Sequence, residues 1–130
     1  MRVALLRTEG YGLEAEIDVD GCRLRVMDAI SPIEEPAAPG QVRDPIFTAV
    51  VVAPDSWARA VSENPECEKR LEPSWGWRHR GYCEIVSLDP LRADLGVLVL
   101  ELDLPPDAAR KRGDFVALAI DRIRIARAPV

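Results

Sequence analysis

Residues 13–26 carry the pattern that most restricts how this chain can fold. Four apolar residues alternate with four acidic ones over 13–20, and after Gly21 three apolar residues alternate with two arginines. A period of two is typical of a strand with one buried face. The Asp20-Gly21 pair between the two runs supplies the two positive-φ residues of a tight turn. The pattern therefore predicts an antiparallel hairpin with a two-residue loop.

The length of that loop also predicts the register of the hairpin. Cys22 falls on the apolar face, and the charged face pairs Asp18 with Arg23 and Glu16 with Arg25. Cross-strand pairs of opposite charge contribute roughly 0.2–1 kcal/mol each. We therefore assign these four charged residues to the stability of the hairpin and expect no function from them.

Five further segments have the apolar or alternating character of strands, at residues 3–6, 46–53, 82–88, 95–104 and 115–126. The strand at 82–88 can begin as early as Trp77. In the strand at 115–126 the apolar residues change from even to odd positions at Asp121, which predicts a bulge. Helices are expected to be short, at residues 57–62 behind an N-cap at Asp55 or Ser56, at 65–71, and as one turn at 107–113. The proline-rich residues 31–45 predict a long loop. The length of 130 residues predicts a single domain over 1–130.

The order of these elements is strand, strand, strand, helix, strand, strand, with extra strands before and after. Over residues 13–126 this order resembles that of the oligonucleotide/oligosaccharide-binding barrel, the OB-fold, and no sequence motif adds to the resemblance. We therefore expect a mainly β protein with a small antiparallel barrel that is OB-like. A β-sandwich or a rolled antiparallel sheet would give the same order and stays open as an alternative.

Composition restricts the environment and the partners. Charged residues occur throughout the first 25 positions, and no apolar run approaches the 18 residues of a membrane span. The three cysteines are widely spaced and form no CxxC pair, so we expect reduced thiols in a cytoplasmic protein that does not associate with membranes. The net charge of −5 disfavours nucleic acid as a partner, although a local basic face stays open.

Catalytic and metal-binding patterns are weak. His79 is the only histidine, and Cys83 lies roughly 13 Å away if both belong to one strand, whereas a nucleophile and its base need about 3 Å. No two metal ligands have the close spacing of a zinc site, and no glycine-rich phosphate loop occurs. We expect no catalytic residue, no metal and no cofactor, with three buried thiols and a surface histidine. A small enzyme that uses carboxylates, or Cys67 with His79, is the alternative.

One segment has the composition of a binding surface. Within residues 72–82 the chain places Trp75, Trp77, Arg78, His79, Arg80 and Tyr82, with no acidic residue from Pro73 to Cys83. Tryptophan, tyrosine and arginine dominate the hot spots of interfaces, and aromatic rings with arginine also stack nucleic-acid bases. The alternative is structural: the two tryptophans cover an open end of the barrel, and the arginines pair with acidic side chains.

These observations lead to one expected function and two competitors. We expect a non-enzymatic β-barrel that binds another macromolecule, in the first place a protein, through this segment flanked by the 31–45 loop. Single-stranded nucleic-acid binding is the second hypothesis and requires the segment to share a face with the basic residues Arg110, Lys111, Arg112, Arg122 and Arg124. A homodimer through the edge of the first or last strand stays open as well.

Overall fold

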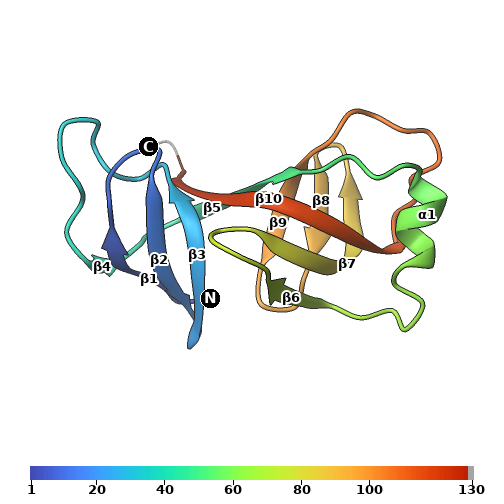
Figure 1. The fold of residues 1–130 in the computed structure, drawn as a ribbon, viewed down its shortest axis with the longest axis horizontal. Coiled ribbons are helices and arrows are strands. Elements are labelled where there is room, and N and C mark those ends of the chain that lie inside the picture. The colour runs from blue at the N-terminus through green and yellow to red at the C-terminus, as the bar shows by residue number, and fades with distance from the viewer. Residues whose placement is uncertain (129–130) are drawn as a thin grey trace.

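The computed structural model describes residues 1–128 and is mainly β, with about 50% strand and 5% helix (Figure 1). Its elements in chain order are β1 (Val3–Thr8), β2 (Glu14–Val19), β3 (Cys22–Asp28), β4 (Gly40–Gln41), β5 (Pro45–Val51), α1 (Trp57–Ser62), β6 (Arg70–Pro73), β7 (His79–Leu88), β8 (Leu91–Asp94), β9 (Val99–Asp103) and β10 (Phe115–Arg127). The expected mainly β protein with a small barrel is therefore confirmed, although one pair of the barrel, β5 with β9, is parallel and not antiparallel.

Five strands close the barrel in the order β10, β5, β9, β8 and β7, with β7 pairing back to β10. Strands β4, β1, β2 and β3 form a sheet beside the barrel, and β10 joins this sheet to the barrel by pairing with β3. The 13–26 hairpin lies in this outer sheet. The element order had placed it within the barrel, which is wrong, because local pattern predicts a hairpin but not the sheet it joins. Figure 1 shows the two halves side by side, and we call the region between them, which β5 and β10 cross, the waist.

The length of β10 explains how one strand serves both halves. Its first part, Phe115–Ile120, pairs with β7, and its second part, from Ile120 to Arg127, pairs with β5. The register shifts between Ile120 and Arg122, which confirms the bulge predicted at Asp121. Because of the bulge, buried side chains can change parity from Ile120 to Ile123 without interrupting the strand.

The β2–β3 hairpin has the predicted register. Asp18 pairs with Arg23 and Glu16 with Arg25, and both turn residues have positive φ, 50° at Asp20 and 91° at Gly21. A strict alternation joined by an Asp-Gly turn leaves only one register that buries every apolar side chain of β2.

Two details of this hairpin differ from expectation. Cys22 is exposed although its partner Val19 is 0% exposed, because no strand within residues 1–128 covers the outer edge of β3 at this end. The ion pairs run diagonally, with Arg23 Nη1 3.9 Å from Glu16 Oε1 and Arg25 Nε 3.7 Å from Glu14 Oε1. Long arginine side chains can reach diagonal neighbours, and the side chain of Arg7 on β1 contacts both glutamates.

Replacing Gly21 tests the turn directly. Gly21→Val places a β-branched residue at φ 91° and is expected to lower the free energy of unfolding by roughly 1–3 kcal/mol. Gly21→Asn should be milder, since asparagine tolerates the left-handed region. Thermal unfolding of both variants measures the difference, and equal melting temperatures would contradict this turn geometry.

The short helices are only partly as predicted. The α1 helix begins behind Ser56, whose Oγ accepts a hydrogen bond from the Arg59 backbone N at 3.0 Å. No helix forms over 65–71. The buried Asn64 side chain accepts a hydrogen bond from the Glu68 N–H and donates to the Glu68 and Val116 carbonyls. These bonds direct the chain into β6. Residues 107–113 form turns and no helix. Strand β8 was not predicted, and β9 begins at Val99, four residues later than expected.

One hydrophobic core runs through both halves and includes Trp57 of α1. Trp57 is 4% exposed, and its Nε1 donates to Asp114 Oδ2 at 2.8 Å, so α1 is held against the start of β10. No helix within residues 1–128 has the length and apolar character needed to span a membrane.

Candidate functional site

The aromatic segment forms a short loop between β6 and β7. We call residues Ser74 to Arg78 the Trp75 loop. Its ends are joined by a hydrogen bond from Ser74 N to Arg78 O at 2.9 Å, and Arg78 N donates to Trp75 O at 3.0 Å. Gly76 has φ 60°, which lets the chain reverse between the two tryptophans. The loop reaches from the barrel toward β3 at the waist (Figure 1).

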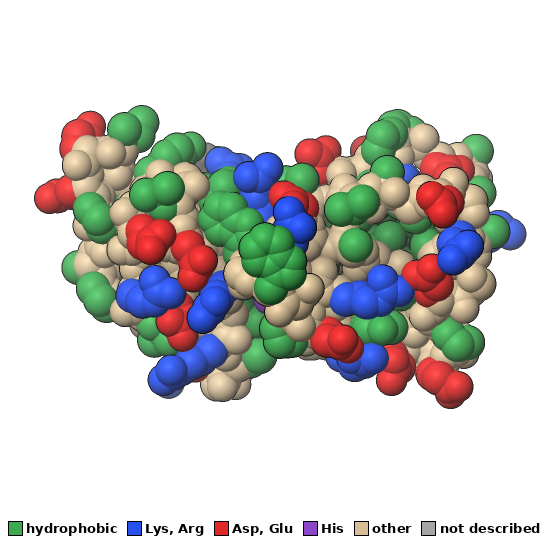
Figure 2. Space-filling view, in the orientation of Figure 1, with side chains coloured by type: hydrophobic (Ala, Val, Ile, Leu, Met, Phe, Trp, Pro, Cys, Tyr) green, Lys and Arg blue, Asp and Glu red, His purple; other side chains and the backbone are tan. Residues whose placement is uncertain are grey.

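Trp75 is the most exposed aromatic side chain of this loop. It is 70% exposed, and the Arg78 guanidinium lies over its ring at 4.7 Å from the centroid. Arg78 Nε is in turn 3.5 Å from Asp121 Oδ1 at the bulge of β10. Figure 2 shows hydrophobic side chains gathered at the centre of this face, over the waist. Asp121 on β10 therefore holds Arg78, and Arg78 in turn holds the exposed Trp75 ring.

Trp77 anchors the same loop. Its side chain is half-buried, with the Arg122 guanidinium 6.0 Å from the ring centroid. Arg122 also pairs with Asp121, with Nε 3.5 Å from Oδ2. One tryptophan is thus free for contact, and the other fixes the loop to β10.

A groove of about 640 Å³ lies between the Trp75 loop and β3. It is lined by Glu16, Cys22, Arg23, Leu24, Arg25, Leu71, Pro73, Ser74, Trp75, Gly76 and His79. A second depression of about 350 Å³ lies on the other side of the loop, against Glu9, Leu13 and Glu14. The Trp75 loop therefore separates two hollows at the waist.

His79 lines the groove but is buried, so the expectation of a surface histidine is wrong. It is 5% exposed, and its Nδ1 lies 3.0 Å from the Trp77 carbonyl oxygen. Burial lowers the pKa of His79, and the hydrogen bond to Trp77 opposes this only in part, so the neutral ring is favoured. With Nδ1–H donating to Trp77, the lone pair of the neutral ring is on Nε2.

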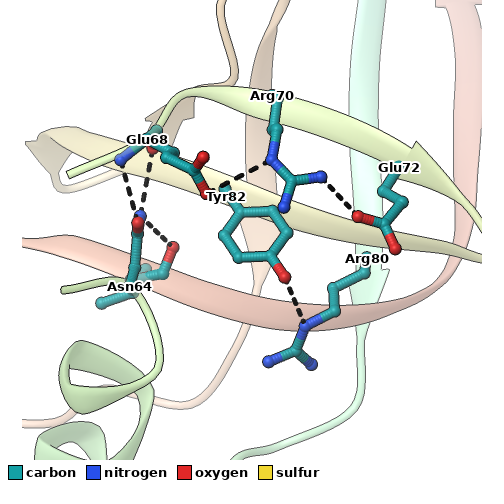
Figure 3. Close-up of polar contacts among 7 residues, drawn as sticks. Asn64, Glu68, Arg70, Glu72, Arg80 and Tyr82 are labelled. Atoms are coloured by element: carbon teal, nitrogen blue, oxygen red, sulfur yellow. Dashed lines mark hydrogen bonds and ion pairs between the residues drawn. The ribbon is translucent and has the colours of Figure 1, made fainter. Parts of the chain in front are cut away.

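Arg80 and Tyr82 belong to a different surface. Both alternate with His79 along β7 and so point to the opposite face of that strand. Figure 3 shows Tyr82 with the Arg70 guanidinium 3.9 Å from its ring centroid and its hydroxyl accepting from Arg80 Nε at 3.3 Å. Arg80 also pairs with Glu63 Oε2 at 2.6 Å. The six predicted binding residues are therefore split between two faces.

The cysteines do not assemble with the histidine. Cys67 is exposed in the turn before β6 and is absent from the lining of the groove that His79 shares. Cys83 is buried, and burial, with a smaller contribution from the charge of Asp94, raises its pKa to about 12. Within the described part of the chain, residues 1–128, no three His, Cys, Asp or Glu side chains are grouped to hold a metal ion.

Two other expected parts of the site lie elsewhere. The 31–45 loop projects from the outer end of the N-terminal sheet (Figure 1), and no residue of it lines the groove or the second depression. Arg110, from the basic 110–112 run, stacks over Trp57 beside α1 at 5.2 Å and does not line the groove.

Sequence reasoning also missed part of the site. Arg23 and Arg25 of β3 line the groove, although they had been assigned to hairpin stability alone. Leu24 of β3 and Leu71 of β6 line it as well, and neither had been named as a site residue. The available signal was the predicted hairpin itself, because each of its strands has an edge that the hairpin does not pair and that another segment can contact.

Comparisons with protein families, curated proteins and solved structures found no match.

Proposed function

We propose that this chain is a non-enzymatic β-barrel module that binds another protein through the Trp75 loop and the groove beside it. The observation that carries the proposal is Trp75 itself, 70% exposed and held in place by Arg78. An exposed tryptophan next to a concave surface is typical of an interface anchor, because burying it on binding releases a large hydrophobic free energy.

The charges around the loop support a protein partner over nucleic acid. Arg78 and Arg122 both pair with Asp121, and Arg80 pairs with Glu63. Carboxylates also line both hollows, Glu16 in the groove and Glu9 with Glu14 in the second depression. The surface around Trp75 thus carries charges of both signs, with Arg23 and Arg25 beside Glu16 in the groove, and such a mixture favours a protein surface over the uniformly negative phosphates of nucleic acid.

Single substitution of Trp75 tests the proposal. Binding partners are recovered from an extract of the source cells with the immobilised chain, and the affinity of the recovered protein is then measured by calorimetry. Trp75→Ala is expected to lower that affinity about 30-fold, the effect of losing a hot-spot contact of about 2 kcal/mol. Leu88→Ala is the matched control, because Leu88 is 48% exposed at the other end of β7.

Two results would contradict the proposal. Equal affinity of Trp75→Ala and the wild-type chain, with both folded, removes the loop from the interface. Binding of labelled single-stranded oligonucleotides that weakens steeply between two salt concentrations would favour the nucleic-acid alternative instead.

A further inference from the structure

Within residues 1–128, no strand pairs with one edge of β3 along most of its length. Strand β3 pairs with β2 through residues Cys22–Met27, whereas β10 reaches its other edge only at Met27 and Asp28. A sheet edge with unpaired backbone groups can accept another strand.

The phase of the hairpin shows which backbone groups of β3 are free. In a two-residue hairpin the residues that flank the loop, here Val19 and Cys22, exchange hydrogen bonds, and bonding alternates from there. Leu24 therefore bonds to β2, while the N–H and C=O groups of Arg23 and Arg25 point away from β2. Asp28 N donates to Leu13 O at 2.9 Å, which agrees with this phase. Arg23 and Arg25 are also the two basic residues of the groove.

The opposite wall of the groove is a second strand edge, β6, which a proline interrupts. Ser74 N bonds to Arg78 O, so by alternation the backbone groups of Leu71 and Pro73 on β6 point away from β7. Pro73 has no N–H to donate. The β6 edge therefore lacks one hydrogen-bond donor, whereas the β3 edge has both the N–H and the C=O group at Arg23 and at Arg25.

The side chains of the groove define the chemistry of an incoming strand. Arg23 and Arg25 are 74% and 56% exposed and project from one face of β3, where Glu16 is the one acidic residue among the groove lining. The buried Leu24 projects from the opposite face, and Trp75 lies across the groove. A strand beside β3 would thus meet positive charge on one face and apolar surface on the other.

We propose that the groove binds an extended peptide segment of the partner protein, added as a strand to the free edge of β3. Its backbone pairs with Arg23 and Arg25. Its acidic side chains lie beside the two guanidinium groups, and its alternate, apolar side chains lie on the Leu24 face. This mode of binding rests on the proposed function and specifies it: main-chain hydrogen bonds hold the segment, and alternate side chains give the specificity.

Peptide selection with amide hydrogen exchange tests this mode. Random heptapeptides displayed on phage are selected on the full chain, and the tightest one is synthesised as the probe. We expect the selected sequences to alternate acidic and apolar residues. Bound probe should slow exchange of the Arg23 and Arg25 amides at least tenfold, while the Leu24 and Val26 amides, already bonded to β2, change little.

A second measurement does not depend on how variants fold. Methylating alternate backbone nitrogens of the probe should weaken binding at least tenfold for one set of positions and leave binding unchanged for the other set, because only every second N–H faces β3.

Substitutions in the chain give a third measurement. Arg25→Pro should weaken binding more than Arg25→Ala, since both lose the guanidinium but only proline also loses the N–H.

The outcomes separate this inference from the proposed function. Unprotected Arg23 and Arg25 amides, equal effects of both methylation sets, or no selected peptide overturn strand addition. If Trp75→Ala still weakens binding of the partner protein in those cases, the protein-binding function stands without it. A dimer in solution, formed by pairing of two β3 edges, would identify a second copy of the chain as the occupant of the groove and would also overturn the proposal.

Discussion

Replacing Asp28 with alanine is expected to lower the free energy of unfolding by about 2–4 kcal/mol, the largest effect we expect from a single polar residue. Asp28 ends β3 and is 0% exposed. Its carboxylate accepts from Ile30 N at 2.7 Å, from Ser31 N at 2.9 Å and Oγ at 2.5 Å, and from the Thr8 hydroxyl. Alanine would leave these donors without their acceptor, and the loss is most costly for the two donors of Ser31, which is 4% exposed.

Urea denaturation measures this loss, and Asp103→Ala is the control. Asp103 is exposed on β9, so its removal should change stability by no more than about 0.5 kcal/mol. Equal losses in the two variants would contradict the structural importance of Asp28.

The pH dependence of the wild-type chain provides a second check on Asp28. Burial alone would raise the pKa of this carboxyl, but the hydrogen bonds from Ser31, Thr8 and Ile30 outweigh burial and lower it below its ordinary value of 3.8. The ionised carboxylate therefore stabilises the fold above pH 3.8, and that contribution is lost as the pH falls through the lower pKa of the folded state. Asp28→Asn should remove this part of the acid sensitivity.

Replacing Gly81 with valine should be nearly as damaging, at about 3 kcal/mol, because it overfills the barrel. Gly81 lies on β7 opposite Leu118 of β10. A Cβ at this position would lie 2.8 Å from Ile120 Cδ1 and 3.0 Å from Leu95 Cδ2. Ile120 is 3% exposed and Leu95 is 1% exposed, so neither methyl group has free space to move into.

Ala119→Val is the matched control for Gly81→Val. Ala119 lies on the neighbouring strand opposite Arg80, but its side chain is exposed, so two added methyl groups meet solvent. Thermal unfolding should show a large drop for Gly81→Val and almost none for Ala119→Val. A Gly81→Val protein as stable as the wild type would show that the barrel is less tightly packed here.

The parts of the fold that the sequence predicted are those determined within a few residues. The alternation through Asp20-Gly21 specifies a register, the parity change at Asp121 specifies a bulge, and Ser56 specifies the start of α1. Strand β8 was missed although Leu91 and Ala93 do alternate with polar residues, because four residues are too few to stand out from a turn. The segment after Asn64 was misread, because its conformation depends on a bond to the distant Val116 carbonyl.

The candidate site shows the same division. The composition of residues 72–82 identified Trp75, Trp77 and Arg78, which do lie together at the waist. Composition could not separate them from Arg80 and Tyr82, since alternation along β7 sends those two side chains to another face.

By itself, the sequence determined the strand-rich class, the hairpin and its register, and the aromatic composition of residues 72–82, because hydrophobic period, turn chemistry and residue type act over short distances along the chain. Only the tertiary structure decided that the hairpin lies outside the barrel, that β10 serves both halves, and that Arg23 and Arg25 face Trp75 across a groove. These outcomes depend on which strand edges meet, and pairings between strands distant in sequence are determined by packing of the whole core. No pattern within a single segment encodes such pairings.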